Sequence, residues 1–258
     1  MVTRPTAAYL YCVVRSDRPP SLARAPRGVP AATRPEAHAV GRSLWIVAAS
    51  VPLDIYGPAS LEGRLGDLDW VSRVALAHEA LVEHVAGVRT ATVIPTKLFT
   101  MFSSLDKAVA DVASRRAAIL QATRRIAGAA EWGVRVFHRP RRPSAKAPAA
   151  KSGAEFLRAR KQARDAGALA RTAAADGART ALSALRRHAR DLRLRSPRDG
   201  AAPDPPILDA AFLVSVSARG RFEAEARRQS RALEKAGAAL VLTGPWPAYN
   251  FVVPGERS

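Results

Sequence analysis

Two histidines lie close together in the sequence and could in principle hold a metal ion. They are His78 and His84, the ends of the segment HEALVEH. When two residues of a helix are six positions apart, the second side chain is rotated by about 240° from the first. Two metal ligands on one face of a helix need a spacing of four residues. The spacing therefore argues against a zinc site. His78 falls on the apolar side of the expected helix, which predicts a core histidine whose ring nitrogen meets a backbone carbonyl or a Glu side chain.

The motifs of nucleotide and nucleophilic chemistry are missing from the sequence. It contains no phosphate loop of the form Gly-x4-Gly-Lys-Ser/Thr, no Gly-x-Gly-x-x-Gly after a strand and no Gly-x-Ser-x-Gly turn. Cys12 is the sole cysteine and lies inside a predicted strand, which indicates a structural thiol. We therefore expect a protein that is not an enzyme, with no metal, no cofactor and no small-molecule substrate.

The chain is strongly basic, with 41 Lys and Arg residues against 22 Asp and Glu and a net charge of +19. Residues 139–200 hold 17 of the basic and 5 of the acidic residues, so most of the excess lies in one segment. Such a patch has a nucleic-acid interpretation, in which arginines contact phosphates. Aromatic residues that could stack on bases are almost absent there, so the favoured interpretation is that the arginines solvate an Ala-rich helix. Binding of an acidic protein partner ranks between this interpretation and nucleic-acid binding.

The length of 258 residues fits one large or two small domains. A single cysteine cannot form an internal disulfide, which favours a reducing compartment. The longest apolar stretch, 44–53, is about ten residues, too short to span a membrane. We therefore expect a cytoplasmic protein.

The elements that must position these residues follow from hydrophobic periodicity. Strands or extended segments are predicted at 9–14, 43–51, 92–99, 131–137, 211–216 and 238–243. Helices are predicted from Asp67 to about Gly87, from Ser103 or Ser104 to Gly128, and over 221–236. The order strand, helix, strand at the C-terminal end predicts a right-handed, parallel βαβ unit. The aromatic tail 246–253 is expected to pack onto a sheet.

Two segments are less regular. Residues 19–42 contain several prolines and little periodicity, so they are interpreted as a long loop or disordered insertion. Residues 153–195 form an Ala- and Arg-rich arm that is helical by propensity. Because Gly167 and Gly177 each cost about 1 kcal/mol inside a helix, we expect a break into two helices or a hairpin.

Several motifs together resemble the GvpL/GvpF family of gas vesicle proteins. The matching stretches are YLY at 9–11 with VV at 13–14, LDW at 68–70, HE at 78–79, VIP at 93–95 leading to Phe99, EWGVRV at 131–136 and GPWPAYNFV at 244–252. The last two are the most specific. Residues 96–98 depart from the family pattern, as do Ala248 and Asn250 in the tail.

The resemblance implies an accessory or minor structural protein of gas vesicle formation, located at the gas vesicle or in the cytoplasm. It implies an α+β fold with an N-terminal domain of modified ferredoxin-like topology (1–129). A C-terminal α+β domain (130–258) would carry a long, coiled-coil-like helical arm at about 153–195. The implied partners are the hydrophobic shell protein and other vesicle accessory proteins. The alternative is a nucleic-acid-binding protein that uses the basic arm.

Seven residues are candidates for structural or partner contacts: Trp132, Trp246, Tyr249, Phe251, Arg158, Arg186 and Arg190. Core or domain-interface packing is the favoured interpretation of the four aromatic residues. If the Trp246 ring is buried, its replacement by Ala should cost about 3 to 5 kcal/mol.

Overall fold

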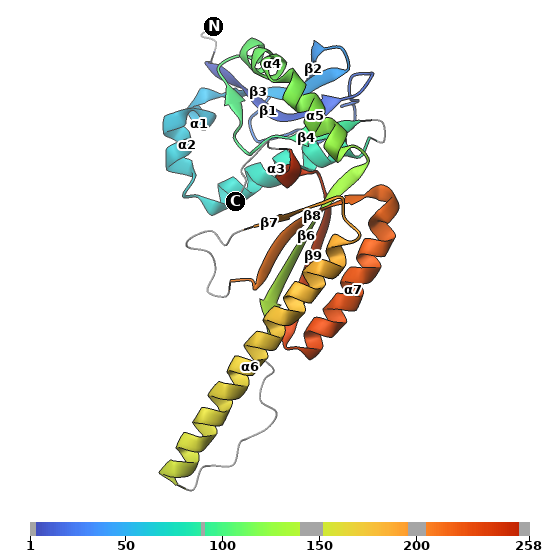
Figure 1. The fold of residues 1–258 in the computed structure, drawn as a ribbon. Helices are drawn as coiled ribbons and strands as arrows, with labels where there is room; N and C mark the ends of the chain where they lie inside the picture. The colour runs from blue at the N-terminus through green and yellow to red at the C-terminus, as the bar shows by residue number, and fades with distance from the viewer. Residues whose placement is uncertain (1–3, 89–90, 140–151, 196–204, 253–258) are drawn as a thin grey trace. The chain divides into compact units, whose positions relative to one another are not determined.

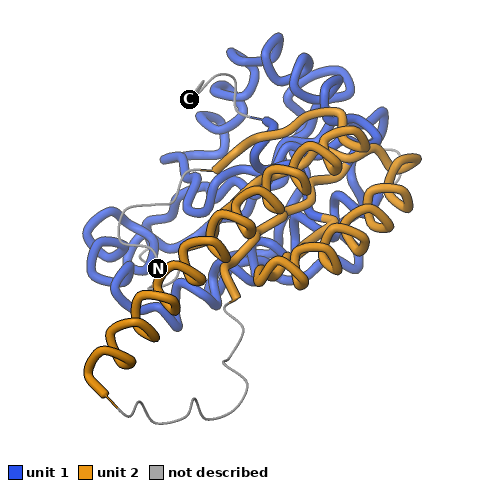
Figure 2. The backbone as a smooth tube through the Cα atoms, turned by 60° about the horizontal axis from the view of Figure 1, so that its bottom comes forward, with its two compact units in different colours: residues 1–129, 246–258 blue, residues 130–245 orange. Residues whose placement is uncertain are grey.

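A computed structural model describes residues 4–88, 91–139, 152–195 and 205–252. It forms two compact units, residues 1–129 with 246–258 and residues 130–245 (Figure 2). The tail from Trp246 was expected in the C-terminal domain, and that expectation is wrong: it belongs to the first unit. The reason is local packing, because Tyr249 contacts the core of that unit.

The first unit is built on an antiparallel sheet in which the first strand of the chain lies in the middle (Figure 1). The strand order is β2-β3-β1-β4, and β5 also pairs with β1. The strands are β1 (Thr6–Arg15), β2 (Glu36–Gly41), β3 (Leu44–Pro52), β4 (Thr92–Pro95) and β5 (Met101–Phe102). The ferredoxin-like topology implied by the resemblance stays a prediction.

A β-bulge in β1 decides which side chains enter the core. Leu10 pairs with Ala48 and Cys12 pairs with Val47, so Tyr11 is the extra residue. A bulge reverses the alternation of faces. As a result Tyr9, Tyr11 and Cys12 all join one buried cluster.

Five helices accompany this sheet: α1 (Leu53–Tyr56), α2 (Pro58–Arg64), α3 (Leu68–Ala86), α4 (Leu105–Ser114) and α5 (Arg116–Ile126). Asp67 caps α3 by accepting a hydrogen bond from the Trp70 N–H. Ser104, one of the two predicted starting residues of the next helix, caps α4 by accepting a hydrogen bond from the Lys107 N–H. The buried side of α3 comprises Trp70, Val74, His78, Leu81, Val82 and Val85. Leu68, at the start of the helix, is 76% exposed.

Two expectations for this unit are corrected. Residues 19–42 are not a structureless insertion: they contain β2, and Val29 is buried with its N–H donating to the Tyr11 hydroxyl. The single helix expected after Ser104 is divided at Arg115, whose backbone leaves the helical region. The division lets α4 pack on β1 and β2 while α5 packs on β4.

The second unit is a four-stranded sheet with the order β7-β8-β6-β9. Its elements are β6 (Ala129–His138), α6 (Gly153–Arg186), β7 (Asp191–Leu194), β8 (Leu208–Ser215), the 3₁₀ turn η1 (Val216–Ala218), α7 (Arg219–Lys235) and β9 (Ala238–Trp246). A second 3₁₀ turn, η2 (Tyr249–Phe251), follows in the tail. The expected βαβ unit has β6 between its two strands, so β8 and β9 do not pair.

The basic arm differs from its prediction in two ways. First, α6 continues through both glycines without a break. At Gly177, packing of the C-terminal half of α6 against α7 and the sheet outweighs the helix-breaking tendency of glycine, while no such packing by the described residues surrounds Gly167. Second, residues 191–194 of the predicted helical arm form strand β7, which pairs with β8. Hydrogen bonding to β8 overrides helical propensity there.

Candidate protein-interaction surface

His78 lies in an aromatic cluster in the core of the first unit. Its Nδ1 is 3.0 Å from the Tyr9 hydroxyl, and its ring packs 5.5 Å from that of Tyr11. Burial lowers the pKa of His78 to about 4, so the ring is neutral at neutral pH. The core position agrees with the prediction. The bonded partner from β1, 69 residues away, could not have been read from local spacing.

The neighbouring reactive groups are equally enclosed. Cys12 is fully buried, and burial raises the pKa of its thiol, which therefore stays protonated. Burial also raises the pKa of Tyr11 to about 12. Among the residues that the structure describes, no three His, Cys, Asp or Glu side chains gather in a way that could hold a metal ion.

The four candidate aromatic residues have different environments. Trp132 is buried, and its ring centroid lies 5.9 Å from that of Phe222. The Arg219 guanidinium lies 5.6 Å from the Trp132 ring centroid. Phe251 is buried and Tyr249 packs on the core of the first unit. Trp246 is 37% exposed. Of the four, only Trp246 presents a large part of its ring to solvent.

The three candidate arginines do not form one site. Arg186 donates from Nη1 to the Ala189 carbonyl at 3.3 Å, and Arg190 donates from Nε to Ser215 Oγ at 2.9 Å. Both therefore hold the turn that follows α6. Arg158 lies 28 positions before Arg186 on the same helix, about 42 Å away at 1.5 Å per residue.

The N-terminal part of α6 is the most exposed regular element described. We call residues 153–172 the free segment of α6, and it extends beyond the sheet and α7 (Figure 1). Its three large apolar side chains are exposed by 56% at Phe156, 64% at Leu157 and 72% at Leu169. The sequence analysis noted these residues as sparse apolar positions but not that solvent surrounds them.

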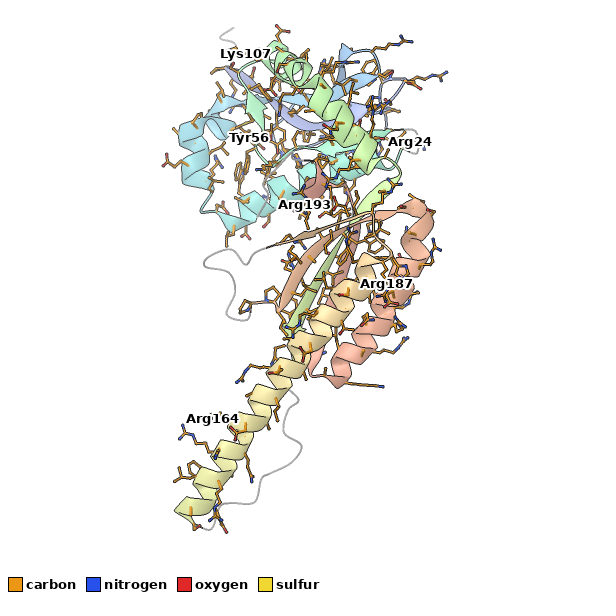
Figure 3. All side chains as sticks on the ribbon, in the orientation of Figure 1. Arg24, Tyr56, Lys107, Arg164, Arg187 and Arg193 are labelled. Carbon is orange, nitrogen blue, oxygen red and sulfur yellow. The ribbon has the colours of Figure 1, made fainter. Side chains whose placement is uncertain are left out.

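The charges of the free segment are mostly uncompensated. Its five basic residues are Arg158, Arg160, Lys161, Arg164 and Arg171, against the acidic Glu155 and Asp165. Among the described residues, the one ion pair that these five basic residues form joins Arg164 Nε to Asp165 Oδ1, at 3.8 Å. Figure 3 labels Arg164, which stands on the exposed part of the helix.

A shallow pocket of about 300 Å³ on the free segment is lined by Leu157, Arg160, Lys161 and Arg164. An apolar side chain surrounded by cations offers both hydrophobic contact and charge attraction to a partner. None of the helices in the described parts of the chain is long and apolar enough to cross a membrane.

Comparisons with known proteins show the family to which the chain belongs. Residues 7–253 match the family described as Gas vesicle synthesis protein GvpL/GvpF. The chain is 31% identical over 232 residues to Gas vesicle protein L of Streptomyces sp. (strain CB03234), a match that covers 83% of this chain and 82% of the relative. The chain therefore belongs to the GvpL/GvpF family of gas vesicle synthesis proteins.

Two solved structures share the fold at 14% sequence identity. The gas vesicle protein GvpF from Anabaena sp. PCC7120 superposes with a TM-score of 0.69, covering 98% of each chain. GvpF from Microcystis aeruginosa gives a TM-score of 0.64, covering 96% of this chain and 99% of its own. The mixed α/β architecture with antiparallel pairing is thus that of GvpF.

Proposed function

We propose that this protein is a non-catalytic accessory protein of gas vesicle formation, which binds the hydrophobic shell protein and other vesicle proteins during nucleation or assembly. It would act in the cytoplasm or at the growing vesicle. Membership of the GvpL/GvpF family supports a role in gas vesicle formation. The observation that carries the binding role is the free segment of α6, where both large apolar and cationic side chains are exposed.

The physical reason for such a role lies in the shell subunit. A subunit that builds a gas-facing wall exposes apolar surface before assembly and would aggregate unless another protein covered it. The exposed side chains of Phe156, Leu157 and Leu169 supply apolar contact on different sides of the free segment, and the surrounding cations keep the free protein soluble. The nucleic-acid alternative gains no support from the comparisons.

Co-expression tests this function. The full chain, tagged, is expressed with the shell protein and each vesicle protein of the same gene cluster, and retained proteins are identified by mass spectrometry. We expect retention of the shell protein, and its loss when Phe156, Leu157 and Leu169 are replaced by Ser. Absence of every vesicle protein from the wild-type sample would overturn the proposal.

A matched control removes equally exposed apolar side chains elsewhere. Leu65, Leu68 and Leu76 of the first unit are 52%, 76% and 68% exposed, so their triple replacement by Ser changes surface hydrophobicity to a similar extent. This control should retain the shell protein. Point substitutions are preferable to deletion of 150–200, which would also remove β7 and the buried half of α6.

A further inference from the structure

We propose that the free segment of α6 binds an acidic amphipathic helix supplied by another gas vesicle protein. This inference rests on the proposed function and adds the chemistry of the partner. Two independent observations carry it. One is the continuation of a helix-packing face into solvent, and the other is the one-sided distribution of positive charge.

The packing face is established in the C-terminal half of α6. Ala174, Ala178 and Ala181 are buried there against Leu233 of α7 and the sheet. α7 reaches its last turn opposite Gly177, where a methyl group would meet Leu233 at 3.0 Å and Ala236 at 3.9 Å. Beyond this point no described helix covers the face.

The same face continues through the free segment. At 3.6 residues per turn the positions that follow it backwards from Ala174 are Ala170, Gly167, Ala163, Arg160 and Phe156. Three of these are small enough to let another helix approach closely, and Phe156 provides an apolar end contact. A partner helix placed there would continue the contact that α7 makes with the other half of α6.

The positive charge lies along one edge of this face. Spaced by 100° per residue, Arg160 lies at the margin of the face, and Arg171, Arg164 and Lys161 follow beside it within the next sector of about 100°. Arg158, the fifth basic residue, lies on the opposite side of the helix. The acidic residues Glu155 and Asp165 lie outside that sector. A helix packed on the face therefore places its flanking side chains beside four cations, and acidic flanks satisfy them.

Other possible binding partners, namely a second copy of the chain, a lipid surface or a nucleic acid, fit this face less well. A second copy would bring two basic edges together, which is repulsive. The large side chains Phe156, Leu157 and Leu169 are spread around the helix, unlike the single apolar side of a helix that lies on a lipid surface. Phosphate contacts of a nucleic acid would leave these apolar side chains uncovered.

Two synthetic peptides provide the test. Both are four-heptad helices with Leu at a and d positions, and they carry Glu or Lys at the flanking e and g positions. Binding to the full chain is measured by fluorescence anisotropy. We expect the Glu peptide to bind at least about tenfold more tightly than the Lys peptide, since this preference would need only about 1.4 kcal/mol.

Charge reversal makes the test specific. R160E/R164E/R171E should weaken binding of the Glu peptide at least about tenfold and strengthen binding of the Lys peptide. The control R221E/R227E/R231E makes the same change in net charge on exposed positions of α7 and should leave both affinities unchanged within about twofold. Urea unfolding midpoints establish that each variant is folded.

Several results would overturn the inference. They are no binding of the Glu peptide at about 100 μM, equal binding of both peptides, or an unchanged affinity in R160E/R164E/R171E. Binding of phosphatidylglycerol vesicles or a 20-base-pair DNA duplex without binding of the Glu peptide would assign the segment to lipid or nucleic acid instead. If this variant retains vesicle proteins as well as the wild type in co-expression, the inference fails while the proposed function stands.

Discussion

Gly177 of α6 lies directly against Leu233 of α7: a methyl group at Gly177 would be only 3.0 Å from Leu233 Cδ2. The absence of a side chain thus allows the two helices to approach. Gly167, ten positions earlier, has the opposite environment, since a methyl group there would meet only the tip of Arg171 at 3.6 Å. The two glycines of one helix therefore have different physical roles.

The first prediction concerns this pair. Gly177→Leu should destabilise the protein by about 1 to 3 kcal/mol, because the larger side chain overpacks the contact with Leu233. Gly167→Ala should stabilise it by about 0.5 to 1 kcal/mol, because Ala favours the helix and has free space. Urea unfolding of both variants measures the two effects. Equal effects of the same sign would contradict the packing described.

The second prediction concerns the Tyr9 hydroxyl. It lies 3.0 Å from His78 Nδ1 and also accepts the Phe99 N–H at 3.3 Å. Tyr9→Phe leaves these groups without the hydroxyl and should cost about 1 to 3 kcal/mol. A double-mutant cycle with His78→Leu should give a coupling of at least about 0.5 kcal/mol. Strict additivity would show that the hydrogen bond contributes nothing.

The third prediction is a pH dependence. Burial lowers the pKa of His78 from 6.5 to about 4, so the folded state favours the neutral ring. The contribution of neutral His78 to the free energy of unfolding is fully present above pH 6.5. As the pH falls towards 4 the unfolded chain takes up the proton first, and stability declines by up to about 3 kcal/mol. His78→Gln should flatten this part of the stability curve. An unchanged slope would mean that other groups cause the acid sensitivity.

The fourth prediction compares two tryptophans. Trp132→Ala should cost about 3 to 5 kcal/mol, because the ring is buried against Phe222. Trp246 is 37% exposed, so its replacement by Ala should cost only about two-thirds as much. Thermal unfolding gives both values. A larger loss at Trp246 would place its ring in a contact that stabilises the fold.

Local signals predicted much of the secondary structure. The start of α4 at Ser104 was predictable because a short polar side chain before an apolar repeat satisfies free N–H groups at a helix start. The core location of His78 followed from its place on the apolar side of α3. The strands of both sheets were indicated by aromatic and β-branched residues, apart from β2, β5 and β7.

The interaction surface was harder to predict. The sequence indicated that basic residues are concentrated after residue 139, and the candidate Arg158 does lie on the free segment. It could not indicate that Arg186 and Arg190 are used by the turn after α6, because their partners Ala189 and Ser215 depend on the local fold. Composition reports how much charge is present, while packing determines which charges remain available.

The sequence by itself determined the family, the starts of α3, α4 and α6 and the region of high charge, since motifs, periodicity and composition are properties of neighbouring residues. The tertiary structure decided the rest. It kept α6 continuous through Gly177 because Leu233 fills the space, and it made β7 a strand because β8 supplies the hydrogen bonds. It also placed Tyr249 in the core of the first unit. These outcomes depend on contacts between distant parts of the chain, whose energies exceed local preferences.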